Sequence, residues 1–156
     1  MSDYRVEKRR AAAELTLSTG ATIRGSFFLA GSTATHPGPE RIADLLNGES
    51  GFFPFAVEAP ADTVLYNRAQ LVSIRLLDGN GEARLDPGYE LATERRVSMM
   101  LSSGQRLVGA VRVYRPIGRD RLSDYARSTD TFRYLEAPDA TFIVNTAHIV
   151  ELKETE

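Results

Sequence analysis

The most chemically suggestive part of the chain is a short stretch, residues 112–121, in which arginines surround an aromatic ring. Arginine can neutralise phosphate groups and tyrosine can stack on a base, so four side chains form a candidate nucleic-acid contact: Arg112, Tyr114, Arg115 and Arg119. Two carboxylates, Asp120 and Asp124, dilute the positive charge. A solvated loop at a strand end is the simpler interpretation, and binding of single-stranded nucleic acid is the alternative.

Residues for catalysis or metal binding are scarce. The chain has no cysteine, which excludes disulfides, thiolate metal sites and cysteine nucleophiles. Its two histidines, His36 and His148, are too few for a histidine metal centre and far apart in the sequence. The glycine-rich phosphate loop, the dinucleotide fingerprint and the hydrolase motifs are absent from the sequence. We therefore expect a protein that is not an enzyme and holds no cofactor or metal.

The composition is that of a globular protein, with 42% hydrophobic and 26% charged residues in a chain of 156. The net charge of −2 hides an asymmetry. Residues 10–78 carry five arginines and seven acids, whereas residues 94–154 carry ten basic residues and eight acids. Only the second part is a candidate anion binder. No apolar run is long enough to cross a membrane and no secretion signal is visible, so we expect a cytoplasmic protein.

The chain contains an internal repeat, which decides the architecture. Residues 17–25 return as residues 101–109 with the same spacing of leucine, serine and glycine. Further on, the sequence Glu-Ala-Pro at 58–60 returns at 136–138, and Asn67 matches Asn145. Because the matching blocks keep their order, we predict two tandem units at 10–78 and 94–154.

Two pairs of glycines recur in the repeat. Gly20 and Gly104 supply the turn of a hairpin, and Gly25 and Gly109 fall inside its second strand. A glycine inside a strand costs about 0.5–1 kcal/mol relative to alanine, so its use in both copies indicates a sharp bend or a bulge. The paired asparagines, Asn67 and Asn145, are typical of a tight turn, where the side chain can bond to nearby main chain. We assign these six residues structural roles.

Each copy is predicted to fold as two strands, a short helix and three further strands. Residues 42, 45 and 46 place apolar side chains on one helical face, and Leu122, Tyr125 and Ala126 repeat that spacing. We expect a short helix or lead-in at 1–13 and an additional strand at 82–85. Units of about 60 residues are marginal alone, so the fold class is mainly β with short helices, in two units that pack as a pseudo-two-fold pair.

This strand order resembles the Sm-like fold, a five-stranded and strongly bent β-barrel. The resemblance is carried by the pattern apolar-x-x-Gly-x-x-x-x-Gly at 17–25 and 101–109, and by the closing strands at 143–152. It implies two small barrels in tandem that associate edge to edge. The family's closing turn holds a nucleotide with Arg-Gly or Lys-Gly, whereas this chain has Asn67-Arg68 and Asn145-Thr146 there. The helix also follows the second strand, whereas the family places one before the first.

These observations favour a module that binds protein, through exposed strand edges or through the groove between the repeats. The partner is another protein or a second copy of the chain. RNA or single-stranded nucleic acid, bound by the more basic second repeat, is the alternative. We expect no interaction with membranes.

Overall fold

The computed structural model describes residues 8–31, 38–77, 81–114, 122–126 and 130–155. The chain folds as a mainly β protein with short helices. The first half contains five strands and one helix: β1 (Lys8–Leu17), β2 (Thr22–Ala30), α1 (Ile42–Gly48), β3 (Phe52–Val57), β4 (Asp62–Asn67) and β5 (Leu71–Leu76). A single 3-10 turn, Arg68–Gln70, separates β4 from β5.

The second half has the same order of elements. They are β6 (Thr93–Leu101), β7 (Arg106–Val113), α2 (Leu122–Ala126), β8 (Phe132–Glu136), β9 (Thr141–Asn145) and β10 (Ile149–Glu154). The 3-10 turn Thr146–His148 lies between β9 and β10, at the position that Arg68–Gln70 has in the first half. Two further 3-10 turns, Glu82–Leu85 and Tyr89–Leu91, lead from β5 to β6.

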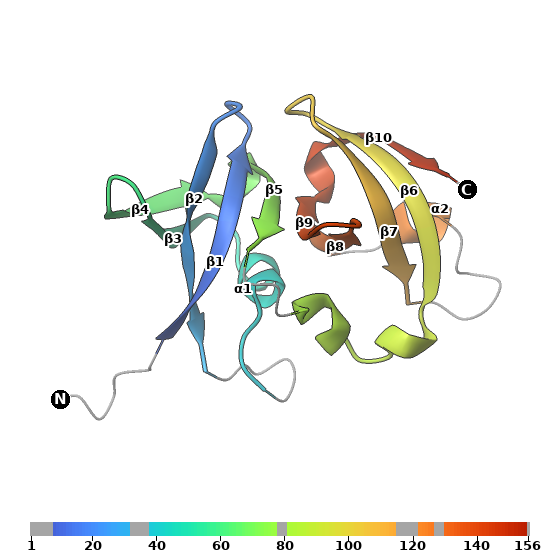
Figure 1. Ribbon diagram of the computed structural model, residues 1–156, viewed down its shortest axis with the longest axis horizontal. Coiled ribbons are helices and arrows are strands. Elements are labelled where there is room, and N and C mark those ends of the chain that lie inside the picture. Colours follow the sequence, from blue (N-terminus) through green and yellow to red (C-terminus); the bar gives the residue numbers. More distant parts are fainter. Residues whose placement is uncertain (1–7, 32–37, 78–80, 115–121, 127–129, 156) are drawn as a thin grey trace.

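All ten strands belong to one antiparallel sheet, in the order β10-β6-β7-β8-β9-β5-β1-β2-β3-β4. Figure 1 shows the two halves side by side, with the β1–β2 and β6–β7 turns at one end and α1 and the connecting 3-10 turns at the other. The halves meet where β5 pairs with β9, in the register Ser73 to Val144, Ile74 to Ile143 and Arg75 to Phe142. Below, this β5–β9 pairing is called the joint.

The joint rules out the pseudo-two-fold relation that we predicted. A two-fold axis exchanging the halves would convert the pairing of β5 with β9 into a pairing of β10 with β4. Instead β4 and β10 are the two outer strands of the sheet. The halves therefore follow one another head to tail, with the fifth strand of the first against the fourth strand of the second.

Glycine allows the second strand of each hairpin to lie close to its neighbour. At Gly25, an added Cβ would lie 2.1 Å from the carbonyl oxygen of Ala56 in β3. At Gly109, it would lie 2.5 Å from the carbonyl oxygen of Glu136 in β8. Both distances are shorter than any real contact, so only glycine fits. Gly20 and Gly104 serve the turns differently, because both have a φ of +88°.

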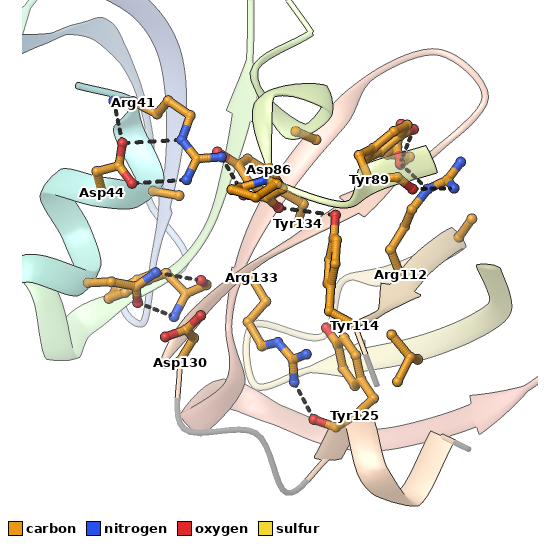
Figure 2. A pocket seen from close by; sticks show the side chains of 18 of the residues that line it. Arg41, Asp44, Asp86, Tyr89, Arg112, Tyr114, Tyr125, Asp130, Arg133 and Tyr134 are labelled. Atoms are coloured by element: carbon orange, nitrogen blue, oxygen red, sulfur yellow. Dashed lines mark hydrogen bonds and ion pairs between the residues drawn. The ribbon is translucent and has the colours of Figure 1, made fainter. Parts of the chain in front are cut away.

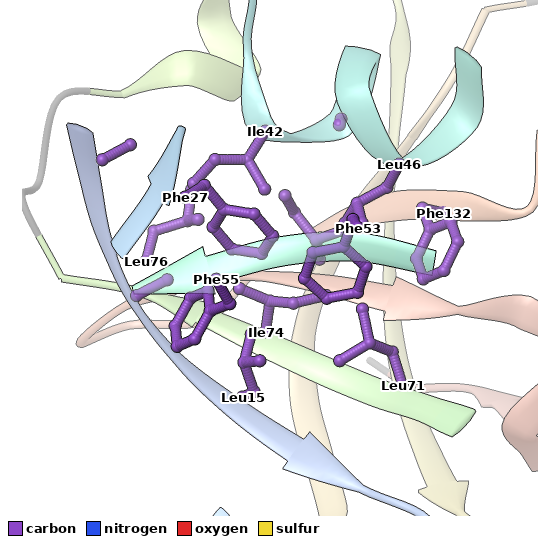
Figure 3. Packing of buried hydrophobic residues seen from close by; sticks show 14 of the residues in the cluster. Leu15, Phe27, Ile42, Leu46, Phe53, Phe55, Leu71, Ile74, Leu76 and Phe132 are labelled. Carbon is purple, nitrogen blue, oxygen red and sulfur yellow. The ribbon is translucent and has the colours of Figure 1, made fainter. Parts of the chain in front are cut away.

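The apolar side chains form two clusters, one in each half. In the first, Phe27 stacks on Phe53 with ring centroids 5.4 Å apart and meets the edge of Phe55 at 5.1 Å. Figure 3 shows these rings between the strands and α1, with Phe132 from the second half at one side. Across the joint, Phe132 and Ile143 belong to the first cluster and Val72 belongs to the second. The halves thus complete each other's cores.

Two local predictions were wrong. Of the helix or lead-in predicted at 1–13, residues 8–13 instead belong to β1, where Lys8 lies opposite Ala30 and Ala13 opposite Gly25, and residues 1–7 lie outside the described ranges. Residues 82–85 form a 3-10 turn instead of a strand, since Gly81 adopts a left-handed φ of 66° and Glu82 turns inward. Within the described ranges, no helix is both long and apolar enough to cross a membrane.

Candidate functional site

The joint is held by side chains as well as by main-chain pairing. Asn145, which is 2% exposed, donates its Nδ2 to the carbonyl oxygen of Leu71 at 2.9 Å and to that of Arg68 at 3.4 Å. Its Oδ1 accepts a bond from the main-chain N–H of Ala147 at 3.0 Å, which caps the following 3-10 turn. One asparagine therefore ends β9 and ties it to the first half.

Two more polar residues cross between the halves. The Nε2 of His148 lies 2.7 Å from the carbonyl oxygen of Ala69. Asn47, at the end of α1, donates to the carbonyl oxygen of Phe132 at 2.9 Å and accepts from its N–H at 2.8 Å. Because Phe132 lies opposite Asn145, the bonds of Asn47 fix the same end of the joint as those of Asn145 and His148.

The outer strands β4 and β10 are the counterparts of the two strands that form the joint. By the repeat, β4 corresponds to β9 and β10 corresponds to β5. Three apolar residues on or beside these outer strands, 62–67% exposed, have counterparts on or beside the joint strands that are 4% exposed or less: Phe52 and Phe132, Leu65 and Ile143, Val150 and Val72. Positions whose side chains are buried where the halves meet are therefore exposed in the matching strands at the outer edges.

A shared β-bulge explains why the two valines correspond. Between β1 and β5, Thr16 pairs with Ser73 and Leu17 pairs with Leu71, so Val72 is skipped. Between β6 and β10, Met100 pairs with Glu151 and Leu101 pairs with Ile149, so Val150 is skipped in the same way. A bulge redirects a side chain across the strand. Val72 enters the core of the second half, whereas Val150 points away from the chain's own core.

Asn67 makes one of the two kinds of side-chain hydrogen bond that Asn145 makes. Its Oδ1 accepts a bond from the N–H of Ala69 at 3.0 Å, as Asn145 does with Ala147. Within the described part of the chain, its Nδ2 has no hydrogen-bond partner, whereas that of Asn145 bonds across the joint. The donor of Asn67 is therefore available at the outer end of β4.

A pocket of about 650 Å³ lies where α1, the connecting 3-10 turns and the second half meet. Figure 2 shows Arg41 facing Asp44 and Asp86 at one side of it. The Arg41 guanidinium donates to both oxygens of Asp44, at 3.1 and 3.0 Å, and also to Asp86. Burial alone would lower the pKa of Arg41, but the bonds to the two carboxylates raise it above the ordinary value, so it stays charged.

Behind Arg41 and its two aspartate partners lies a buried carboxylate. Glu82, 2% exposed, accepts bonds from the N–H groups of Ile42 and Ala43, both at 3.2 Å, and from the hydroxyl of Tyr134 at 2.7 Å. It thus caps the first turn of α1 from a distant part of the chain and joins it to β8. Burial raises the pKa of Glu82, while the three hydrogen bonds oppose that rise.

The candidate nucleic-acid residues are already engaged within the protein or lie beyond the described ranges. Arg112 lies over the ring of Tyr89 at 3.9 Å and 3.5–3.6 Å from the carboxylates of Glu136 and Glu94. Tyr114 donates its hydroxyl to Asp86 at 3.3 Å. Arg115 and Arg119 fall outside the described residues. Nucleic-acid binding therefore stays a prediction. Among the residues that the structure describes, no three metal-binding side chains cluster.

No family model, no curated protein and no solved structure matches this chain. The site is thus defined by its own geometry. Sequence reasoning singled out Asn67 and Asn145 but missed the edge residues Leu65 and Val150. The signal was present, since both are apolar at positions where the other copy also has an apolar residue. Glu82 carries no local signal, because its partners lie 39 or more residues away.

Proposed function

We propose that this chain is a tandem pair of Sm-like units that works as a non-enzymatic assembly module. Its partner is a second copy of the same chain. The fifth strand of the second unit, β10, pairs with the fourth strand of the first unit, β4, of the next copy. The pairing repeats between molecules what the joint does within one.

The observation that supports this most directly is the difference in burial between matched residues. Phe52, Leu65 and Val150 are exposed, and each matches a residue that is buried on or beside the joint strands. An unpaired strand edge is a template for another strand, and proteins usually protect such edges with charge or proline. The outer strand β4 instead presents Leu65 and the side-chain amide of Asn67, whose Nδ2 has no partner among the described residues. These features are those of an edge strand that can pair with a strand of another molecule.

The joint also predicts the register between copies. The offset of 78 residues that relates Asn67 to Asn145 converts the pair Ile74 and Ile143 into Leu152 and Leu65. It converts Ser73 and Val144 into Glu151 and Tyr66. Because such an interface joins unlike surfaces, each added copy exposes a new edge, and assembly continues beyond a dimer until it closes or forms a filament.

Sedimentation velocity over a concentration series tests the proposal. The wild-type protein should form species larger than a dimer, and Leu65→Lys should remain monomeric because it places a charge in the apolar contact. Leu91→Lys is the matched control, since Leu91 is 91% exposed but lies in the connecting turns, away from both edges. A wild-type protein that stays monomeric at high concentration would contradict the proposal.

A further inference from the structure

The pocket beside the joint has the size of a small-molecule site. Its volume of about 650 Å³ lies in the range of ligand pockets, roughly 300–1,000 Å³. It is lined by residues of α1, of the connecting turns and of β7, β8 and α2. The edges β4 and β10 contribute no lining residue among those described, so the pocket is separate from the proposed assembly surface.

The charges of the lining residues nearly cancel. The described lining residues include three arginines and four carboxylates: Arg41, Arg112, Arg133, Asp44, Asp86, Asp130 and Glu136. Arg41 and Arg112 lie in ion pairs with carboxylates of the same wall. With three positive and four negative groups among its described residues, the wall offers an anion no excess of positive charge there. Because Arg41 and Arg112 are already paired with carboxylates of this wall, its described part favours an uncharged ligand.

The walls are also flat. The Arg112 guanidinium lies 3.9 Å from the centre of the Tyr89 ring, and that of Arg133 lies 3.5 Å from the centre of the Tyr125 ring. Figure 2 shows Tyr114 between these two stacked pairs. Guanidinium planes and aromatic rings both pack well against other planar groups. The shape therefore suits a flat molecule better than a globular one.

The Tyr125 hydroxyl is a polar group of the wall that has no hydrogen-bond partner in the described part of the chain. Tyr125 is 3% exposed, and its hydroxyl is buried with no hydrogen-bond partner among the described residues. A buried hydroxyl that makes no hydrogen bond costs free energy, so its retention calls for an explanation. Burial raises the pKa of Tyr125, which keeps the hydroxyl protonated and able to donate. Figure 2 shows the Tyr125 ring directed from α2 toward Tyr114 and Arg133.

We propose that this pocket binds an uncharged, flat heteroaromatic molecule of nucleoside size. A ring nitrogen or carbonyl oxygen of the ligand accepts the hydrogen bond that the Tyr125 hydroxyl lacks among the described residues. The ring packs against the planar side chains of the wall. The inference goes beyond the assembly function and does not depend on it.

Isothermal titration with adenosine, guanosine and uridine tests the site, with adenosine 5′-monophosphate as the charged comparison. We expect saturable binding of at least one nucleoside and weaker binding of the monophosphate. Tyr125→Phe should weaken nucleoside binding at least tenfold while leaving the melting temperature equal or higher, because the unpartnered hydroxyl is gone. Tyr66→Phe, on β4, is the matched control and should bind as the wild type does.

Three results would overturn the proposal. The first is an absence of binding by all three nucleosides at millimolar concentration. The second is a tighter affinity for the monophosphate than for adenosine, which would show that the pocket takes anions. The third is a lower melting temperature of Tyr125→Phe, which would show that the hydroxyl has a partner within the protein.

Discussion

Asn145 donates its side-chain amide to the main-chain carbonyl of Leu71 at 2.9 Å, from the end of one strand to the start of another across the joint. The bond is buried and connects two residues 74 positions apart. Its counterpart in the first half, Asn67, has the same capping bond to the turn that follows it but no such acceptor within the described chain. The two asparagines thus distinguish a filled interface from an open one.

Changing each asparagine to aspartate separates these two roles. Aspartate keeps the oxygen that caps the turn but loses the donor. Asn145→Asp should lower the free energy of unfolding by about 1–3 kcal/mol, because a carboxylate would then face the buried carbonyl of Leu71. Asn67→Asp should leave the unfolding free energy of the monomer within about 0.5 kcal/mol of the wild type and weaken self-association. Urea denaturation and sedimentation velocity measure the two effects. Equal loss of stability in both variants would contradict the assignment.

Glu82 predicts a pH dependence of stability. Burial raises its pKa in the folded state, so the folded protein holds this proton more tightly than the unfolded chain does. Its contribution is therefore most favourable below the ordinary pKa of a glutamate, about 4.3, and is lost as the pH rises through the raised value. Glu82→Gln cannot ionise. The unfolding free energy of the wild type, relative to this variant, should fall as the pH rises from about 4 toward neutrality.

Denaturant titrations at a series of pH values measure that difference. Glu90→Gln is the matched control, because Glu90 is an exposed glutamate in the same connecting segment. Its stability should run parallel to that of the wild type across the same pH range. If the unfolding free energy of the wild type instead rises with pH relative to that of Glu82→Gln, the fold favours the ionised carboxylate and the prediction is wrong.

The glycines of the first hairpin should respond differently to alanine. Gly25→Ala would force a Cβ to within 2.1 Å of the Ala56 carbonyl, so β2 and β3 must separate. We expect a loss of about 3 kcal/mol, at the upper end of the usual cost of overpacking. Gly20→Ala meets no atom within 4 Å but must adopt a φ of +88°, which costs about 1–2 kcal/mol. Chemical denaturation measures the loss of unfolding free energy in each variant. If Gly20→Ala loses as much as Gly25→Ala or more, the close approach of β2 to β3 at Gly25 is contradicted.

Much of the fold could be predicted from local patterns. The alternation of apolar residues located the strands, and the spacing of Ile42, Leu45 and Leu46 located α1. Residues 8–13 could not be predicted in this way. Their charges and alanines resemble a lead-in, and they form a strand because β2 is long enough to pair with them. Glu82 likewise takes its conformation from distant groups on α1 and β8.

The candidate site was harder to predict, because it depends on how the halves meet. The repeat identified Asn67 and Asn145, but it could not say which strands pair across the joint. The predicted pseudo-two-fold relation therefore gave the wrong symmetry. Leu65 and Val150 become informative only when their matched residues, Ile143 and Val72, are seen to be buried.

The absence of cysteine from the chain permits a direct test of assembly by disulfide formation. The register places Leu152 of one copy opposite Leu65 of the next, and residues opposite each other on antiparallel strands lie about 4.5–5.5 Å apart, within reach of a disulfide. The positive control is Ser73→Cys with Val144→Cys, which should close a disulfide within one chain because these residues pair at the joint. Under oxidation, the double variant Leu65→Cys with Leu152→Cys should give a ladder of covalent oligomers on a non-reducing gel. If it stays monomeric while the control pair closes, β10 does not pair with β4 between copies and the account is wrong.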